Sequence, residues 1–146
     1  MRTRLVLLTL AVALLLPAAA QARPAPPAPE HPRGAPPPAW IETARAERWL
    51  AYSSYCWTTP TSGLCADYVD PFRRTDLPRF VVKRGEVVRI HLAFVPTEAF
   101  VTVGRRTVAL EPSRVLEVDV RRGGVLVVHV YGAKGDAGYV GRLVVR

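Results

Sequence analysis

Hydrophobic and polar residues alternate with a period of two in several short segments of this chain. The pattern covers residues 87–95, 114–121, 125–131 and 139–145. In the first of them Arg89 and His91 fall on one face and large apolar residues on the other. Because successive side chains of a strand point to opposite faces, these segments are predicted to be half-buried β-strands.

Turn-forming residues separate the alternating segments. Prolines lie between the hydrophobic runs at positions 71, 78, 96 and 112, as expected at strand boundaries. Residues 132–138, which hold three glycines, predict a long loop between the last two strands. Short strands between regular turns are typical of a small antiparallel β-sandwich, so the predicted fold class is all-β.

Two further segments add detail to this fold. A short N-terminal helix is predicted over Ile41 to Arg48, which follows Pro38 and contains two alanines among charged residues. Residues 80–90 form two hydrophobic runs around Gly85. This strand, glycine kink and strand resembles the opening of bacterial immunoglobulin-like and cupredoxin-like sandwiches, and the resemblance implies architecture without implying an activity.

Residues 1–22 have the three parts of an export signal. Arg2 and Arg4 precede an uncharged run from Leu5 to Leu16, and residues 17–22 end in a small-residue pattern. The apolar run is shorter than the roughly 20 residues that cross a bilayer as a helix. We therefore expect cleavage near Ala22 and a secreted or extracytoplasmic protein with no transmembrane span after cleavage.

A proline-rich segment follows the signal. Residues 23–39 contain eight prolines, and such a segment cannot form a helix or a central strand. It is predicted to be a disordered leader, while a spacer across the cell wall is the less favoured interpretation. Residues 40–146 then form a single domain of ordinary size with a modest core.

The chain has two cysteines, Cys56 and Cys65. In an exported chain this pair predicts one structural disulfide rather than a metal knuckle or a redox-active pair. If the two face each other across an antiparallel hairpin, Tyr55 lies opposite Ala66 and residues 59–62 form the loop.

Aromatic residues are concentrated around this hairpin. Alternation places Tyr55, Trp57 and Tyr68 on one side, and Trp49 has the same parity as Trp57. One interpretation, which we favour, is the inner face of a sheet. The other is a candidate binding face of Trp49, Tyr55, Trp57 and Tyr68 for a polymer or a protein. A sugar ligand is disfavoured because no Asn or Gln follows residue 22.

The hairpin region also carries a resemblance. With Tyr-Cys-Trp at residues 55–57 and Cys-Ala-Asp-Tyr at residues 65–68, it resembles small exported proteins of GC-rich bacteria that have a sandwich-like C-terminal region. The resemblance covers residues 54–70 and the glycine kink. It implies a location outside the cytoplasm and a fold, and it carries no activity.

The chain is basic, with a formal net charge of +8 that includes Arg2 and Arg4 of the signal. Three arginine doublets at predicted turns are candidate anion contacts: Arg73, Arg74, Arg105, Arg106, Arg121 and Arg122. A basic surface outside the membrane attracts anionic wall polymers or lipid head groups. The alternative, which the sequence favours, is a set of solvated turn residues in an arginine-rich chain. Nucleic acid is disfavoured as a partner because no recognition motif is present.

Catalytic and metal-binding patterns are weak. The sequence has neither a Gly-x-Ser-x-Gly elbow nor a phosphate-binding loop, and no cofactor is expected. His91 and His129 fall on the polar faces of their strands and are low-probability candidates for a metal site. The preferred hypothesis is a non-catalytic exported domain that binds a cell-envelope polymer or another exported protein. The alternatives are a metal-handling module that uses these histidines and an inhibitor that presents the disulfide-closed loop Thr58 to Leu64.

Overall fold

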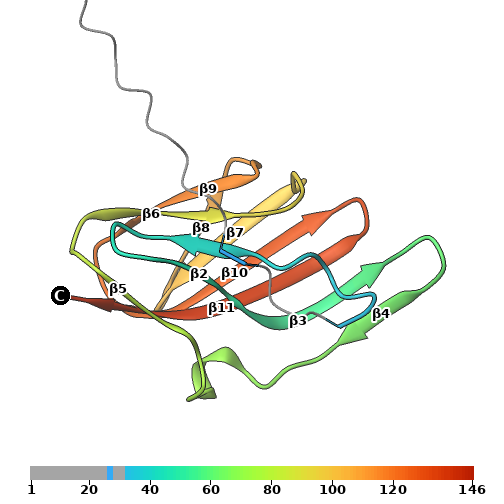
Figure 1. Cartoon of the computed structure of the whole chain (residues 1–146), viewed down its shortest axis with the longest axis horizontal. Helices are drawn as coiled ribbons and strands as arrows, with labels where there is room; N and C mark the ends of the chain where they lie inside the picture. The colour runs from blue at the N-terminus through green and yellow to red at the C-terminus, as the bar shows by residue number, and fades with distance from the viewer. Residues whose placement is uncertain (1–25, 28–31) are drawn as a thin grey trace, which may run out of the picture.

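The computed structural model describes residues 26, 27 and 32–146, so the expected signal peptide lies outside the described residues. This part of the chain forms eleven β-strands, and its one helical element is the single 3₁₀ turn η1 (Pro71–Arg73). None of its helices is long and apolar enough to span a bilayer. The predicted all-β class is confirmed, and the strands form two packed sheets (Figure 1).

The smaller sheet has four antiparallel strands. In spatial order they are β2 (Glu47–Trp49), β1 (Trp40–Glu42), β6 (Glu86–His91) and β9 (Val115–Val120). Strands β1 and β2 are joined by a tight turn, and β1 then pairs with β6 along its other edge.

The larger sheet contains the remaining strands. Its spatial order is β4 (Gly63–Ala66), β3 (Ala51–Thr58), β11 (Gly135–Val145), β10 (Gly124–Gly132), β7 (Glu98–Val103) and β8 (Arg106–Leu110). Strand β11 is long enough to have two neighbours on one edge: its first half pairs with β3, and its second half pairs in parallel with β5 (Arg79–Val82). All other pairs in this sheet are antiparallel.

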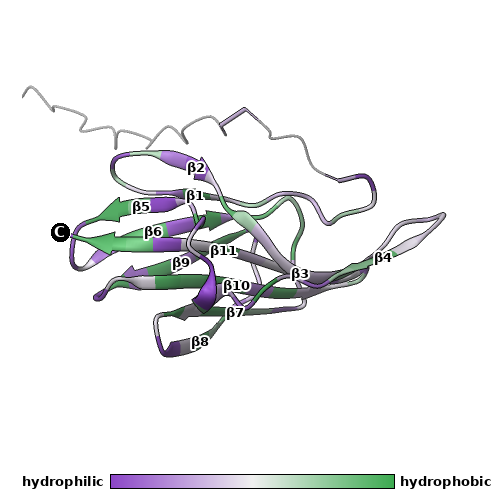
Figure 2. Cartoon of the chain, turned by 90° about the horizontal axis from the view of Figure 1, so that it is seen from below, coloured by the Kyte–Doolittle hydropathy of each residue, from purple (hydrophilic) through white to green (hydrophobic). Residues whose placement is uncertain are grey.

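The core lies between the two sheets. It is built from the inward-facing positions that alternation predicted, among them Val88 and Ile90 of β6, Leu116 of β9 and Val128 of β10, all of which are at most 1 % exposed. The outward-facing positions of β6 and β9 include the charged and exposed Arg89, Glu117 and Asp119, together with the exposed Val87 and Val115. Figure 2 shows this layering from the side, with hydrophobic strands facing one another across the core.

The predicted N-terminal helix over Ile41 to Arg48 is wrong, because these residues form the β1–β2 hairpin. The Thr43 hydroxyl accepts hydrogen bonds from the backbone N–H groups of Arg45 (3.2 Å) and Ala46 (3.0 Å), which closes the turn. Ile41 is fully buried opposite Ile90. Local turn chemistry and pairing with β6 therefore outweigh the weak helix preference of the intervening residues.

The predicted long loop over residues 132–138 is also wrong. The turn between β10 and β11 contains Ala133 and Lys134 alone, and residues 135–138 already belong to β11. Gly135 has a φ of 129°, and a Cβ there would collide with the backbone carbonyl of Cys56. A Cβ on Gly138 would likewise be too close to the backbone of Ser54 in β3. Gly135 and Gly138 therefore allow β3 and β11 to approach closely and are not part of a flexible turn.

Part of the proline-rich leader belongs to the folded domain, contrary to the predicted boundary at residue 40. Residues 32–39, here called the proline strap, lie against the inner side of β3 and β11. The Tyr52 hydroxyl donates to the Pro36 carbonyl at 2.7 Å, and the Tyr139 hydroxyl donates to the Pro37 carbonyl at 2.6 Å. Ala39 is fully buried. Burial also raises the pKa of Tyr52 to about 12, an effect to which the neighbouring tyrosines add.

Candidate functional site

The β3–β4 hairpin has the predicted geometry. Cys56 and Cys65 are direct cross-strand partners and form a disulfide, and Tyr55 pairs with Ala66 as expected. A turn from Thr59 to Ser62 closes the loop through a backbone hydrogen bond of 2.6 Å. A disulfide between two extended strands is consistent with an oxidising compartment.

The aromatic side of this hairpin faces the core. Tyr55 is 3 % exposed and Trp57 is 6 % exposed, and the Trp57 ring packs against Phe94 with centroids 5.0 Å apart. Tyr68, at 38 % exposure, lies at the rim against Tyr55. Two of the four residues of the candidate binding face are therefore core residues, and the four do not form one surface.

The opposite side of the hairpin is polar and exposed. The Ser54 hydroxyl donates to the Asp67 carboxylate at 2.7 Å and accepts from the backbone N–H of Tyr68 at 3.1 Å. These bonds extend the hairpin pairing beyond the end of β4. They hold residues 67 and 68, which follow β4, in place. The polar side of the hairpin therefore has a structural role.

Trp49, the fourth residue of the candidate face, lies on the outer face of the smaller sheet. It is the cross-strand partner of Trp40, which in turn is the partner of His91. The Trp40 and His91 rings are stacked with centroids 3.7 Å apart and planes inclined by 2°. We call Trp49, Trp40 and His91 the aromatic row. Sequence reasoning missed Trp40 because it assigned the following residues to a helix, which hid the strand pairing.

A row of charged residues lies beside the aromatic row on the same face. Arg89 donates to the Glu117 carboxylate at 3.0 Å and approaches Glu42 at 3.6 Å. Glu42 also contacts the His91 Nε2 at 3.0 Å. The side chain of His91 is therefore held between an indole ring and a carboxylate.

The two candidate metal-binding histidines lie far apart in the fold. His91 is on the outer face of the smaller sheet, whereas His129 is on the outer face of the larger sheet. The His129 Nε2 is 3.6 Å from Asp136 of the neighbouring strand β11 and has no hydrogen-bond partner among the described residues. No group of three potential metal ligands occurs among the described residues. One metal site cannot contain both histidines.

Basic residues gather at one end of the sandwich. Four turns meet there, comprising residues 43–46, 83–85, 104–105 and 121–123, and none of them contains an acidic residue. The basic side chains of these turns and of the first residue of β8 are Arg45, Lys83, Arg84, Arg105, Arg106, Arg121 and Arg122, and all are exposed. We call this set the basic end; it lies at the end of the sandwich marked by the C-terminus in Figure 2.

Hydrogen bonds connect the four turns to one another. The Glu86 carboxylate accepts from the backbone N–H of Ala44 and of Lys83, which joins the first two turns. Gly85 donates to the Val120 carbonyl at 2.8 Å, and Gly104 donates to the Val125 carbonyl at 2.9 Å. The turns are therefore fixed relative to one another, and Glu86 is already engaged in holding them.

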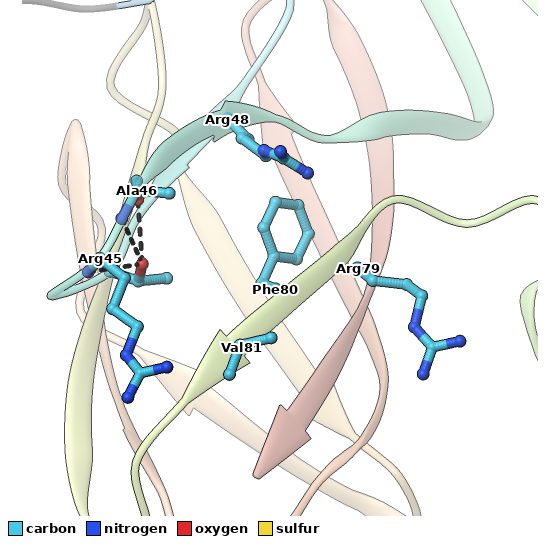
Figure 3. Close-up of a pocket in the computed structure, with 7 residues that line it drawn as sticks. Arg45, Ala46, Arg48, Arg79, Phe80 and Val81 are labelled. Carbon is cyan, nitrogen blue, oxygen red and sulfur yellow. Dashed lines mark hydrogen bonds between the residues drawn. The ribbon is translucent and has the colours of Figure 1, made fainter. Parts of the chain in front are cut away.

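A shallow hollow continues from the basic end along the open side of the sandwich. It lies between β2 and β5, which are edge strands, and has a volume of about 180 Å³. Arg45, Arg48 and Arg79 surround it, and Phe80 lies between them (Figure 3). Figure 3 shows Arg48 reaching over the Phe80 ring, while Arg79 extends outward on the far side. We call these three arginines and Phe80 the arginine hollow.

The third arginine doublet lies elsewhere. Arg74 is mostly buried and donates to the Tyr52 carbonyl at 2.9 Å and to Asp76 at 2.9 Å. Its hydrogen bond holds the pKa of the Asp76 carboxyl below its usual range. Arg73 is exposed and 3.9 Å from Asp70. Of the six candidate anion contacts, four therefore come together at the basic end, whereas Arg74 has a structural role.

Comparisons with known proteins add no further constraint. No family model, curated protein or solved structure matches this chain. Any functional conclusion must therefore come from the geometry of the surfaces described above.

Proposed function

We propose that this protein is a non-catalytic exported domain that binds an anionic polymer of the cell envelope through the basic end. The observation that carries the proposal is the convergence of four turns that contain six basic side chains and no acidic residue, with Arg106 of β8 beside them. Of these basic side chains, Arg121 also forms an ion pair with Asp119 of β9 at 2.8 Å. Export itself rests on the sequence pattern of residues 1–22. The disulfide between Cys56 and Cys65 supports it.

The arrangement suits a polymer better than a single small anion. One exposed arginine contributes little by itself, because solvent screens its charge. Several guanidinium groups on fixed turns can bind successive charges of one chain, and each contact releases counterions from that chain. The arginine hollow extends the same positive surface along the side of the sandwich, where guanidinium groups can bind phosphate or carboxylate in a bidentate manner.

The proposal is tested by charge reversal at the basic end. Arg105 and Arg122 lie on different turns and have no acidic partner among the described residues. The double variant Arg105→Glu, Arg122→Glu should bind inorganic polyphosphate and polygalacturonate at least tenfold more weakly than the parent protein, measured by calorimetry at low salt. Dextran, which is neutral, should not bind to either protein.

The matched control reverses two charges at the opposite end of the sandwich. Arg114 lies in the β8–β9 loop and Lys134 in the β10–β11 turn, and both are exposed. The variant Arg114→Glu, Lys134→Glu has the same net charge as the test variant. It should bind the two polyanions within twofold of the parent. Equal losses in the two variants would mean that net charge alone, and not the basic end, determines binding.

A further inference from the structure

The aromatic row takes no part in the proposed polyanion binding, although its rings are arranged as a surface. Trp49, Trp40 and His91 occupy neighbouring register positions on three adjacent strands. The Trp40 ring is stacked on His91, and all three side chains are half-buried rather than fully exposed. A row of flat rings across a sheet offers a wide apolar contact together with the N–H donor of each indole.

One contact identifies the kind of segment that this surface accepts. The Trp49 Nε1–H donates to the backbone carbonyl of Pro27 at 2.6 Å. Proline-rich segments adopt the polyproline II conformation, in which backbone carbonyls have no internal hydrogen-bond partner. Aromatic grooves recognise such segments by ring contacts and by donors directed at these carbonyls.

The same chemistry recurs in the proline strap. The Tyr52 hydroxyl donates to Pro36, and the Tyr139 hydroxyl donates to Pro37. Three aromatic side chains of the sandwich strands therefore donate hydrogen bonds to proline carbonyls of the proline-rich segment. Only four residues separate Pro27 from Pro32, where the strap begins, so the Trp49 contact and the strap contacts belong to one continuous segment of sequence.

The charges near the aromatic row are compatible with this segment. Beside the rings lie Glu42 and Glu117, which share the single guanidinium of Arg89. The sequence from Arg23 to Pro27 carries one basic residue and no acidic residue. Attraction between this carboxylate-rich row and a basic proline-rich segment is therefore favourable.

We infer that the aromatic row is a docking site for a polyproline II segment and that its occupant is the chain's own leader at Pro26 and Pro27. The leader is then a tethered ligand. A short tether gives an effective concentration on the order of millimolar, so the leader occupies the row in preference to a free proline-rich peptide of similar affinity. Loss of the contact opens the row to such a peptide.

The first measurement follows the three indole N–H resonances of the full mature chain by NMR. In the variant Pro26→Gly, Pro27→Gly the backbone carbonyls remain, but the preference for polyproline II is lost. We expect the Trp49 indole resonance to shift and its solvent exchange to increase. The Trp57 indole lies in the core and serves as an internal control, with an unchanged resonance.

The second measurement adds a synthetic peptide with the sequence of residues 23–29. We expect it to bind the Pro26→Gly, Pro27→Gly variant about tenfold more tightly than the parent chain, because the tethered competitor is weakened. The further substitution Trp49→Phe in this variant keeps an aromatic ring but removes the N–H donor. We expect it to lower the affinity of the variant for the peptide. An unshifted Trp49 resonance, or a peptide that does not bind the proline variant, would overturn the inference.

Discussion

The aromatic residues of this domain differ in what their polar atoms contact. Trp57 packs through its ring, against Phe94, and is 6 % exposed. Tyr52 and Tyr139 instead donate hydrogen bonds from their hydroxyl groups to proline carbonyls of the strap. Their rings contribute to the core, and their hydroxyl groups fix the segment that covers it. The strap is therefore held by specific donors as well as by apolar contact.

Truncation of Trp57 should have a large effect on stability. A buried tryptophan replaced by alanine leaves a cavity, so Trp57→Ala should lower the free energy of unfolding by about 3 to 5 kcal/mol. Tyr68→Ala, at the rim of the same cluster, should lower it by less than half as much. Urea unfolding followed by circular dichroism measures both. Similar values for the two variants would contradict the core position of Trp57.

The raised pKa of Tyr52 should make the free energy of unfolding decrease at alkaline pH. Its folded pKa is raised to about 12 from an ordinary value of 10.0. Between these two pH values the folded state binds more protons than the unfolded state, so the free energy of unfolding decreases as pH rises. The contribution is complete below pH 10 and is lost as pH approaches 12. Tyr52→Phe should reduce this slope in urea titrations, and an identical slope would contradict the assignment.

Alternation predicted which hairpin residues share a side, and it could not predict what covers that side. Tyr55 and Trp57 lie together, as their parity requires, with the disulfide on the opposite side. Whether a shared side faces solvent or a core depends on another layer of structure. That layer includes the proline strap, which composition identified as a disordered leader. Proline content predicts the absence of helix, and it does not predict whether a tyrosine donor is available.

At the level of elements, the β3–β4 hairpin combines a disulfide with a glycine-dependent contact. The disulfide links the two strands at Cys56 and Cys65. On its other edge β3 contacts β11 at Gly135, where the backbone of Cys56 leaves no space for a side chain. The hairpin is therefore constrained on both edges of β3.

Removal of the disulfide should destabilise the domain by about 2.7 kcal/mol, because the unfolded chain gains the entropy of the open loop. For a domain of this size the melting temperature should fall by roughly 10 °C or more. The variant Cys56→Ala, Cys65→Ala and the reduced parent protein should agree in calorimetry. A variant with an unchanged melting temperature would show that the hairpin is fixed by its other contacts alone.

Gly135→Ala tests the second constraint. The residue has a φ of 129°, and its added methyl group would collide with the Cys56 carbonyl, so we expect a loss of about 2 kcal/mol or more. Gly63 begins β4, and a Cβ there meets nothing within 4 Å. Gly63→Ala is the matched control and should change the free energy of unfolding by less than about 0.5 kcal/mol. Equal effects in chemical denaturation would argue against the close approach of β3 and β11.

Sequence patterns predict most strands of the fold and miss the two shortest. The alternation in β9 and β10 is clear from the sequence. Strands β1 and β2 have three residues each, too few for a period to be recognised. They form because the Thr43 side chain closes the turn and because β6 offers a partner edge. Glycines within β11 were mistaken for a loop, since a close backbone approach leaves the same sequence signal as a turn.

At the level of the whole molecule, charge is distributed unevenly. The doublets at residues 105–106 and 121–122 were recognisable in the sequence as separate turns. Their meeting with Lys83 and Arg84 depends on the order of strands in both sheets, which the sequence does not reveal. The strand order thus brings basic residues that are far apart in the sequence together at one end of the molecule.

This concentration of like charge should itself oppose folding at low ionic strength. Added salt screens the repulsion, so the melting temperature should rise between about 10 and 150 mM sodium chloride, as the Debye length falls from roughly 30 to 8 Å. The variant Arg105→Glu, Arg122→Glu should melt higher than the parent at the low-salt end and show a smaller rise. The opposite-end variant Arg114→Glu, Lys134→Glu has the same net charge and should keep most of the parent's salt dependence. If both variants lose the salt dependence of the melting temperature equally, charge repulsion is spread over the whole surface and is no stronger at the basic end than elsewhere.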